Sequence, residues 1–337
     1  MKAWILPRLG SIDDLQLADI PEPVAAPGEV VLTVRYAALN PADRYLAEDQ
    51  YPARPSFPHI LGRDAVDVVA SIGPGVTAVR PGQRLAVLRG EAGVSRPGTF
   101  AELVAVPAEN LVHVPDDWTD QQAAGATLVY LTAYQALTQW GELPPSVVLV
   151  TGASGGVGIA CIQLAVSLGH TVIALSRGQA KVQVLRDMGA AAVFDSTNPQ
   201  WRKQCKEFLG ERRVDLAIDN VGGPVLPAVI DTLGMCGRVS VVGRLAGPVP
   251  EFNTASLLFR RIRIGGVAVG TYSNAESRQA WQAVLQLLAK TGARPLVDRV
   301  FPFDQLPVAF SRLREGPLGK VPGVFPDLNW ARRPPMQ

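Results

Sequence analysis

The stretch Val147–Ala160, VVLVTGASGGVGIA, decides the fold of this chain. Its first four residues are valine or leucine without polar alternation, which is typical of a strand buried on both faces of a parallel sheet. The glycines that follow permit a tight turn, a close approach of the backbone to a pyrophosphate, and close packing of a helix on the strand. The free amides and positive dipole end of that helix favour an anion. We therefore predict a dinucleotide-binding turn at Ser154, Gly155, Gly156 and Val157.

The surrounding sequence supports this interpretation despite one departure from the G-x-G-x-x-G pattern. Ala153 stands where that pattern has its first glycine, which weakens the motif taken alone and leaves an ordinary strand-to-helix turn as the alternative. A second apolar run, Thr171–Leu175, follows after Gly169. A strand, a glycine turn, a helix and another strand at this spacing form the βαβ unit of dinucleotide-binding domains.

The end of the second predicted strand indicates which dinucleotide binds. Sites that prefer NAD place Asp or Glu about 20 residues beyond the glycines, where it binds the ribose 2′-hydroxyl. Here the segment 174–178 reads ALSRG and contains no acidic residue. Ser176, Arg177 and Lys181 offer a hydroxyl and two cations that suit a 2′-phosphate. We therefore expect NADPH, the alternative being that the two cations only solvate the start of a helix.

Apolar runs alternate with helical stretches from about residue 144 onward. The predicted strands are Val147–Val150, Thr171–Leu175, Ala192–Phe194, Val214–Ile218, Arg238–Val242 and Ile262–Val267. The helical stretches that separate most of them are Ile159–Leu168, Gln179–Met188, Trp201–Leu209 and Pro224–Leu233. This alternation predicts an α/β fold with a doubly wound, six-stranded parallel Rossmann domain.

The N-terminal part of the chain has a different pattern. Pro and Gly recur at short intervals between β-type runs such as Val30–Val34 and Val66–Ser71, which is typical of a small β-rich domain. The Ala-rich, Pro-free stretch Asp120–Leu137 then predicts a helix, and strands and helices are mixed beyond Gly270. We expect a β-rich domain over residues 1–122 and 272–337 and a dinucleotide-binding domain over residues 123–271.

Composition and charge exclude several classes of protein. Apolar residues make up 47% of the chain and charged residues 18%, which is typical of a globular protein and excludes a disordered one. The formal net charge is only +2, and the charges are well mixed, so nothing favours nucleic acid or an anionic membrane surface. Three widely separated cysteines, no signal peptide and no membrane-length apolar run indicate a cytoplasmic protein.

The whole pattern resembles the medium-chain dehydrogenase/reductase superfamily, and within it the zinc-independent quinone oxidoreductases of the zeta-crystallin-like branch. The resemblance covers nearly the whole chain. It is carried by AALNPADRYLAEDQY (37–51), PHILGRDAVDVVASIG (58–73), GTFAELVAVPAENLVHVPD (98–116), LTAYQAL (131–137), VTGASGGVGIACIQLA (150–165), VDLAIDNVGG (214–223), GRVSVVG (237–243) and GPLGKV (316–321). It implies a GroES-like β-rich catalytic domain beside the Rossmann domain and a homodimer joined through sixth-strand edges near residues 263–270.

The resemblance also bears on metal binding. Zinc-dependent members of the superfamily take ligands from a Cys where this chain has Asn40, and from a Gly-His-Glu where it has Gly62-Arg63-Asp64. A further ligand comes from near the position of Leu128. An amide, a guanidinium and an isobutyl group cannot assemble a tetrahedral site of nitrogen and sulfur ligands. We therefore expect no metal.

Without zinc there is no Lewis acid, and hydride transfer to an acceptor that needs little activation becomes the expected reaction. By resemblance, Asn40 lies beside the nicotinamide as a catalytic and cofactor-binding candidate, the alternative being a turn-forming Asn before Pro41. Tyr51 falls where related enoyl-thioester reductases have a tyrosine thought to protonate the product, and it is either a proton donor or an aromatic wall. The remaining cofactor contacts implied by the resemblance are Thr132, Val242, Gly243, Thr271 and Lys320, the last with an exposed surface lysine as its alternative.

Three hypotheses about function follow. The leading one is an NADPH-dependent, zinc-independent oxidoreductase that transfers hydride to a quinone. The second is NADPH-dependent reduction of an activated carbon–carbon double bond in an enal, enone or enoyl thioester, and Tyr51 does not decide between the two. The third is an NADPH-binding sensor or RNA-binding protein, against which the near-neutral charge argues. The expected partner is a small-molecule electrophile, with no nucleic acid and no membrane.

Overall fold

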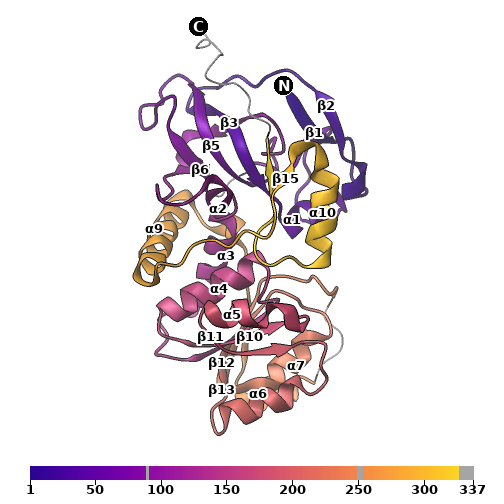
Figure 1. Ribbon diagram of the computed structural model, residues 1–337, viewed down its shortest axis with the longest axis vertical. Coiled ribbons are helices and arrows are strands. Elements are labelled where there is room, and N and C mark those ends of the chain that lie inside the picture. The colour runs from indigo at the N-terminus through magenta and orange to yellow at the C-terminus, as the bar shows by residue number, and fades with distance from the viewer. Residues whose placement is uncertain (89–90, 249–252, 326–337) are drawn as a thin grey trace. The chain divides into compact units, whose positions relative to one another are not determined.

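A computed structural model describes residues 1–88, 91–248 and 253–325 of the chain. The chain divides into two compact units. Unit 1 comprises residues 1–128, residues 273–278 and the described residues from Pro295 onward. Unit 2 comprises residues 129–272 and 279–294. Figure 1 labels many of the helices and strands of both units.

These units differ from the expected domains at Tyr272, which lies in unit 2, and over two longer stretches. Residues 123–128 lie in unit 1, because the Thr127 hydroxyl and the Leu128 amide both donate to Asp64. Residues 279–294 lie in unit 2, where the Gln163 side chain donates to the Arg294 carbonyl. Helix α9 (Asn274–Thr291) therefore passes from one unit into the other.

Unit 2 is built on a six-stranded sheet in the order β11-β10-β9-β12-β13-β14, and all neighbouring strands are parallel. The strands are β9 (Val147–Thr151), β10 (Thr171–Ser176), β11 (Ala190–Asp195), β12 (Val214–Asp219), β13 (Leu233–Val241) and β14 (Arg263–Gly266). All six predicted strands are present, which confirms the doubly wound fold. The strand order reverses between β9 and β12, so a topological switch point lies at the carboxyl ends of these two strands.

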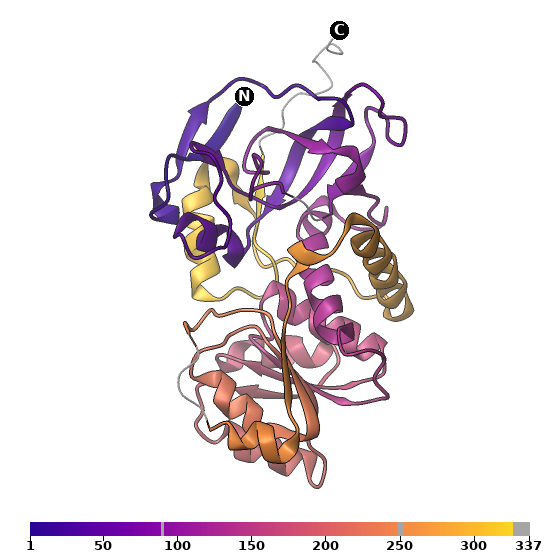
Figure 2. The same cartoon turned by 180° about the vertical axis from the view of Figure 1, so that it is seen from behind.

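Helices cover both faces of this sheet, as Figures 1 and 2 show. One face carries α4 (Gly156–Ser167) and α5 (Val182–Asp187), and the other carries α6 (Trp201–Leu209), α7 (Val225–Thr232) and α8 (Ala255–Arg260). The unit also contains most of α3 (Thr127–Thr138) and the short 3-10 helices η3 (Gln179–Lys181) and η4 (Val269–Thr271). Across the part of the chain that the structure describes, no helix has the length and apolarity that a membrane crossing needs.

Unit 1 is β-rich and contains two sheets. The larger runs β15-β16-β3-β5-β6-β8, with β7 also paired to β3, and the smaller runs β2-β1-β4. The strands are β1 (Lys2–Leu6), β2 (Gln16–Asp19), β3 (Glu29–Ala38), β4 (His59–Ile60), β5 (Asp64–Ile72), β6 (Arg84–Val87), β7 (Leu103–Pro107), β8 (Leu111–Val112), β15 (Phe301–Pro302) and β16 (Pro322–Val324). The helices are α1 (Pro41–Ala47), α2 (Asp120–Ala124), α10 (Leu306–Glu315) and the 3-10 helices η1 (Ile12–Asp14), η2 (Ala108–Asn110) and η5 (Phe303–Gln305). Strand β16 joins segments from both ends of the chain, because it pairs with the end of β3.

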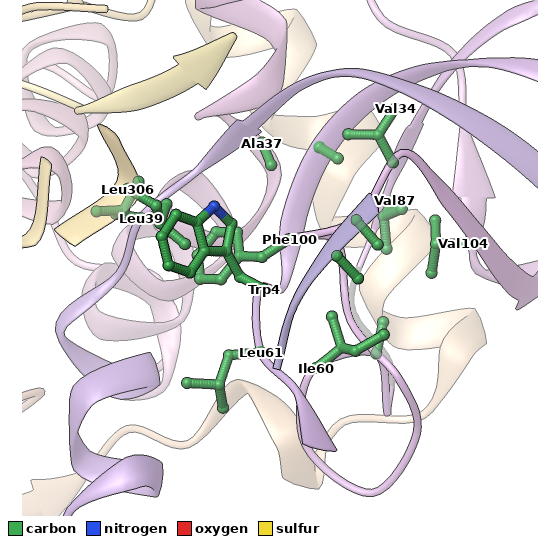
Figure 3. Close-up of a cluster of buried hydrophobic side chains, with 14 of the residues drawn as sticks. Trp4, Val34, Ala37, Leu39, Ile60, Leu61, Val87, Phe100, Val104 and Leu306 are labelled. Carbon is green, nitrogen blue, oxygen red and sulfur yellow. The ribbon is translucent and has the colours of Figure 1, made fainter. Parts of the chain in front are cut away.

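The hydrophobic core of unit 1 also draws on both ends of the chain (Figure 3). Trp4, Phe100 and Leu306 are all buried in it. The Trp4 ring nitrogen donates to the Phe303 carbonyl at 2.7 Å. Phe100 meets Phe310 edge to face with ring centres 5.9 Å apart. These contacts fix the C-terminal segment against the N-terminal strands, and that segment carries a lysine of the candidate site.

The helix predicted over Asp120–Leu137 is instead two helices, α2 and α3, separated at Gly125. A Cβ on Gly125 would lie 2.9 Å from carbons of the Lys320 side chain, so the backbone passes directly against that side chain. Beyond the break, the Thr127 hydroxyl donates to Asp64. The break follows from contacts with residues distant in sequence, which local helix propensity does not report.

Candidate functional site

The first candidate site is the turn between β9 and α4 in unit 2. Gly155 is the N-cap of α4, and the Ile159 amide donates to its carbonyl at 2.9 Å. The amides of the preceding first turn therefore have no acceptor within the helix. A Cβ on Gly158 would lie 2.4 Å from the Gly152 carbonyl oxygen, so only glycine lets the helix pack this closely. The turn has the free amides and the close packing that a pyrophosphate site requires.

Ser176, the last residue of β10, lies at the same edge of the sheet. Its hydroxyl is buried and, within the described ranges, has no hydrogen-bond partner. Lys181 Nζ donates to the Ser154 hydroxyl at 3.2 Å, which joins the segment after β10 to the turn after β9. Arg177 follows Ser176 and is exposed. A hydroxyl and two cations therefore lie at the carboxyl ends of adjacent strands, an arrangement that suits a phosphate.

The structure adds an acidic residue that the sequence analysis missed. Strand β11 pairs with β10 so that Asp195 lies opposite Ser176. The Thr197 amide and hydroxyl donate to the Asp195 carboxylate at 2.9 and 2.8 Å, and with the Gly178 amide they lower the pKa of Asp195. The carboxylate is thus held by Thr197 of its own loop and by the Gly178 amide of the segment after β10. The sequence of the second strand, β10, does not contain Asp195. Only the pairing of β11 with β10 places Asp195 opposite Ser176.

A buried polar network lies where β9 and β12 end, at the switch point. Asp219 accepts a hydrogen bond from the Thr151 hydroxyl at 2.6 Å, and its carbonyl accepts from the amides of Val242 and Gly243. The Asn220 side chain donates to the Thr151 carbonyl at 2.8 Å, while its Oδ1 is buried without a partner in the described residues. The sequence analysis missed Asn220, although polar residues that end a buried parallel strand indicate the binding edge.

Two predicted cofactor residues lie elsewhere in unit 2. Thr132 is a largely buried residue of α3. Thr271 ends η4, where its hydroxyl donates to the Ala268 carbonyl at 2.7 Å. The cofactor roles of both threonines stay predictions.

The second candidate site is a buried polar cluster in unit 1. Its centre is Asp64, the first residue of β5, which is fully buried. Asp64 Oδ1 accepts from the Thr127 hydroxyl and the Leu128 amide, both at 3.1 Å, so the carboxylate caps the start of α3. Asp64 Oδ2 accepts from the Asn40 side chain at 3.0 Å and from Lys320 Nζ at 3.1 Å. Donors from three distant segments therefore converge on one carboxylate.

Lys320 supplies the cation of this cluster. The residue is only 5% exposed. Its Nζ donates to the Leu39 carbonyl at 3.0 Å, to Asn40 Oδ1 at 2.7 Å and to Asp64 Oδ2 at 3.1 Å. An ammonium group has three hydrogens, and these three acceptors use all of them. Lys320 is therefore an internal counter-ion and not an exposed surface residue, and its role as a cofactor contact stays a prediction.

Asn40 is occupied in the same cluster. Its Oδ1 accepts from Lys320, and its two amide hydrogens go to Asp64 Oδ2 at 3.0 Å and to the Ala38 carbonyl at 3.3 Å. The side chain has no hydrogen left for a cofactor or a substrate. In this structure Asn40 supports the start of α1, before Pro41, and its expected roles as a catalytic residue and cofactor ligand stay predictions.

Arg63 links Tyr51 to a second buried acid. The Arg63 guanidinium carbon lies 4.3 Å from the centre of the Tyr51 ring, and Nη1 donates to the Tyr51 hydroxyl at 3.0 Å. Arg63 Nε lies 3.7 Å from Oδ1 of the fully buried Asp43. Burial raises the pKa of Asp43 to about 6, although the Arg63 charge lowers it in part. The sequence analysis gave Arg63 no role beyond replacing a zinc-ligating histidine, and Asp43 none.

Two of the side chains that, by the resemblance, stand at zinc-ligand positions are thus engaged with other protein groups. Asn40 is bound to Lys320, and Arg63 is bound to Tyr51. Among the residues whose structure is described, no three His, Cys, Asp or Glu side chains form a group that could hold a metal ion.

The chain is similar to known proteins in both sequence and structure. Residues 26–116 match the alcohol dehydrogenase GroES-like domain, and residues 156–290 match the zinc-binding dehydrogenase family. Quinone oxidoreductase of Lama guanicoe is 28% identical over 330 residues, which cover 95% of this chain and 96% of that protein. A Sinorhizobium meliloti protein assigned as an alcohol dehydrogenase is 30% identical, with a TM-score of 0.88 and 97% of each chain covered. A mycobacterial protein solved with NADPH is 26% identical, with a TM-score of 0.86, covering 96% of this chain and 100% of that one.

A doubly wound dinucleotide-binding sheet and a GroES-like β-rich unit in one chain define an oxidoreductase. The chain belongs to the medium-chain dehydrogenase/reductase superfamily, and its relatives there include quinone oxidoreductases. The family and the fold class expected from the sequence are therefore confirmed.

Proposed function

We propose that this chain is an NADPH-dependent, zinc-independent reductase that transfers hydride to a quinone. The observation that carries the proposal is the Lys320 ammonium bound by Asn40 and Asp64. The Lys320 ammonium neutralises the buried Asp64 carboxylate, so this charge needs no metal ion to balance it. The residues of the cluster are also not a ligand set for a Lewis-acidic metal. The acceptor is then one that takes hydride without metal activation, and a quinone is such an acceptor.

The choice of NADPH is supported by the residues after β10. The Ser176 hydroxyl is buried and has no hydrogen-bond partner among the described residues, and together with the Arg177 and Lys181 cations it suits a 2′-phosphate. The free amides of α4 suit a pyrophosphate, and the unpartnered Asn220 Oδ1 suits a ribose hydroxyl. NADPH, when bound, supplies the hydride.

Two comparisons support the same reaction class. The relative from Lama guanicoe is a quinone oxidoreductase, and the mycobacterial neighbour was solved with NADPH. Each aligns over at least 95% of this chain, so the likeness extends over both units.

Reduction of an activated carbon–carbon double bond is the second candidate, and the Tyr51 hydroxyl favours it. Such a substrate needs a proton after the hydride arrives. The Tyr51 oxygen accepts a hydrogen bond from Arg63 Nη1, which leaves the phenol hydrogen available for donation. An enal, enone or enoyl thioester is then the acceptor.

Initial rates of NADPH oxidation by the purified protein test both candidates. The acceptors are an ortho-quinone and an enoyl thioester, each with NADPH or NADH and with or without a metal chelator. The proposal expects quinone turnover that prefers NADPH and is unchanged by the chelator. Preference for the enoyl thioester, lost in Tyr51→Phe, supports the second candidate instead. Loss of activity with the chelator contradicts zinc independence, and tight NADPH binding without any turnover indicates a sensor.

A further inference from the structure

We propose that Arg63 is a positioning residue that fixes Tyr51 as the proton donor of the reaction, and that Asp43 holds Arg63 in place. The inference rests on the second candidate of the proposed function, reduction of an activated carbon–carbon double bond, because that reaction needs a proton and Tyr51 is its donor. All three residues lie in unit 1, so the contacts that carry the inference belong to one compact body.

Arg63 contacts Tyr51 in two ways at once. Its guanidinium carbon lies 4.3 Å from the ring centre, and its Nη1 donates to the hydroxyl at 3.0 Å. The cation over the ring face and the hydrogen bond at the ring edge together fix both the position and the rotation of the phenol. Because the Tyr51 oxygen accepts from Arg63, its own hydrogen points away from Arg63. Tyr51 is only half-buried, so part of the side chain is accessible to a small molecule.

Asp43 anchors Arg63 from the first turn of α1. Its Oδ2 accepts from the backbone amide of Asn40 at 2.8 Å, and its Oδ1 lies 3.7 Å from Arg63 Nε. The charged groups that face Asp43 are Arg63, Lys320 and Asp64. Lys320 is already paired with Asp64, so Arg63 is the cation that compensates Asp43.

The contact between Arg63 and Asp43 lacks hydrogen bonds among the described residues, so it does little to stabilise the fold. Nε and Nη2 of Arg63 and Oδ1 of Asp43 are buried and have no hydrogen-bond partner in the described ranges. Buried donors and acceptors without partners lower stability, and a buried ion pair is weak evidence for stability on its own. Such groups call for a functional explanation. The contact that is well formed is the one between Arg63 and Tyr51.

The proton transfer balances in charge and atoms. The hydride brings two electrons to the acceptor, which becomes an anion while the cofactor is oxidised. The O–H bond of Tyr51 breaks and its proton passes to that anion, which gives the neutral reduced product. The phenolate left behind accepts a charge-assisted hydrogen bond from the Arg63 guanidinium, which stabilises it. Water then returns a proton to Tyr51.

A double-mutant cycle on the full chain tests the coupling of Arg63 to Tyr51. Arg63→Met keeps a long side chain but removes the charge and the donors, and is expected to lower kcat about 10- to 100-fold with KM changed less than about threefold. In a Tyr51→Phe background, the same substitution is expected to change kcat less than about twofold. The matched control is Arg54→Met at an exposed arginine that pairs with Asp49 in the loop that carries Tyr51, and it is expected to leave kcat unchanged.

The pH dependence of kcat separates a positioning role from a purely structural one, because a loss of packing alone does not change that dependence. Burial raises the pKa of Asp43 to about 6, so kcat of the wild type is expected to fall below about pH 6 as Asp43 takes a proton and releases Arg63. Asp43→Asn is expected to remove this acidic limb. Arg63→Lys is expected to restore part of kcat only, because lysine lacks the planar fork that both stacks and donates. An acidic limb that persists in Asp43→Asn contradicts the role of Asp43.

Arginine side-chain NMR separates failure of the inference from failure of the proposed function. In protein labelled with ¹⁵N-arginine, Arg63 is expected to give a slowly exchanging guanidinium signal that is lost in Tyr51→Phe. If that signal is present but no acceptor is reduced, the proposed function fails and the donor role of Tyr51 fails with it, while the Arg63 contact stands. If the wild type is active and Arg63→Met lowers kcat equally in both backgrounds, or not at all, the positioning role is overturned.

Discussion

Replacing Asp67 is expected to stabilise unit 1 and to reduce the loss of its stability as the pH rises above about 4. Asp67 lies within β5, opposite Val34 of β3 and Leu85 of β6. It is fully buried, and neither carboxyl oxygen has a hydrogen-bond partner among the described residues. Burial raises the pKa of Asp67 well above its ordinary value, and the nearby Asp120 carboxylate raises it further.

The magnitude follows from the two unpaired oxygens. A buried polar group without a partner costs about 1–3 kcal/mol, and leucine has nearly the branched shape of aspartate. Asp67→Leu is therefore expected to raise the free energy of unfolding by about 1–3 kcal/mol near neutral pH. The added apolar contact of leucine raises this free energy further, and the tighter packing lowers it. Asp67→Asn is the matched control, because it keeps unpaired polar atoms but cannot ionise.

The pH dependence has a definite sign. The folded chain holds the Asp67 proton to a higher pH than the unfolded chain, in which aspartate titrates near about pH 4. The contribution to stability is therefore complete below about pH 4 and is lost as the pH rises toward the folded-state pKa, by about 1.4 kcal/mol per pH unit. Both substitutions at Asp67 are expected to remove this slope.

Urea unfolding followed by tryptophan fluorescence at acidic, neutral and alkaline pH measures both effects. For a urea slope of about 3 kcal/mol/M, the midpoint of Asp67→Leu is expected to rise by about 0.3–1 M near neutral pH. A lower midpoint for Asp67→Leu at every pH would refute the reasoning, because it would show that the carboxyl group has a partner in the fold. An unchanged pH slope in Asp67→Asn would do so as well, because Asp67 would then titrate as an ordinary aspartate.

The remaining predictions concern the glycine turn, the 2′-phosphate site, the buried ion pair and the sheet edge. Gly158→Ala is expected to abolish NADPH binding in fluorescence titrations, because its Cβ would lie 2.4 Å from a backbone oxygen. Arg177→Glu is expected to raise KM for NADPH about 10-fold or more in initial-rate assays while KM for NADH changes little, because a carboxylate repels the 2′-phosphate. Lys320→Met is expected to lower the free energy of unfolding in urea titrations by about 3–5 kcal/mol, because Asp64 stays buried without its counter-charge. Light scattering is expected to show a homodimer joined at the β14 edge, weakened by Phe259→Ser, since Phe259 on the preceding helix α8 is 75% exposed.

Each of these has a contrary outcome. NADPH binding that survives Gly158→Ala would show that the turn does not hold the pyrophosphate. Equal changes in KM for NADPH and NADH in Arg177→Glu would place the 2′-phosphate elsewhere. Undiminished stability of Lys320→Met would show that Asp64 does not depend on that cation. A light-scattering mass equal to one chain would exclude the homodimer.

Local sequence patterns determined the architecture of unit 2 and the edge of the sheet where its site lies. Six apolar runs at βαβ spacing predicted the six-stranded parallel sheet, which is confirmed. The glycine turn and the Ser176 segment lie at the carboxyl ends of adjacent strands for the same reason, since residues that end parallel strands meet at one edge of the sheet. Hydrophobic periodicity and glycine turns depend on neighbours in the chain, so they can be recognised without the tertiary structure.

Only the tertiary structure decided the roles of Lys320, Asn40 and Arg63. Lys320 lies 256 residues from Asp64 and 280 from Asn40 in sequence, and nothing local marks it as buried. It is buried because strand β16 from the C-terminal end pairs with β3. The physical reason is that the burial of a charge, and the partners that satisfy it, depend on which distant segments surround it once the chain has folded.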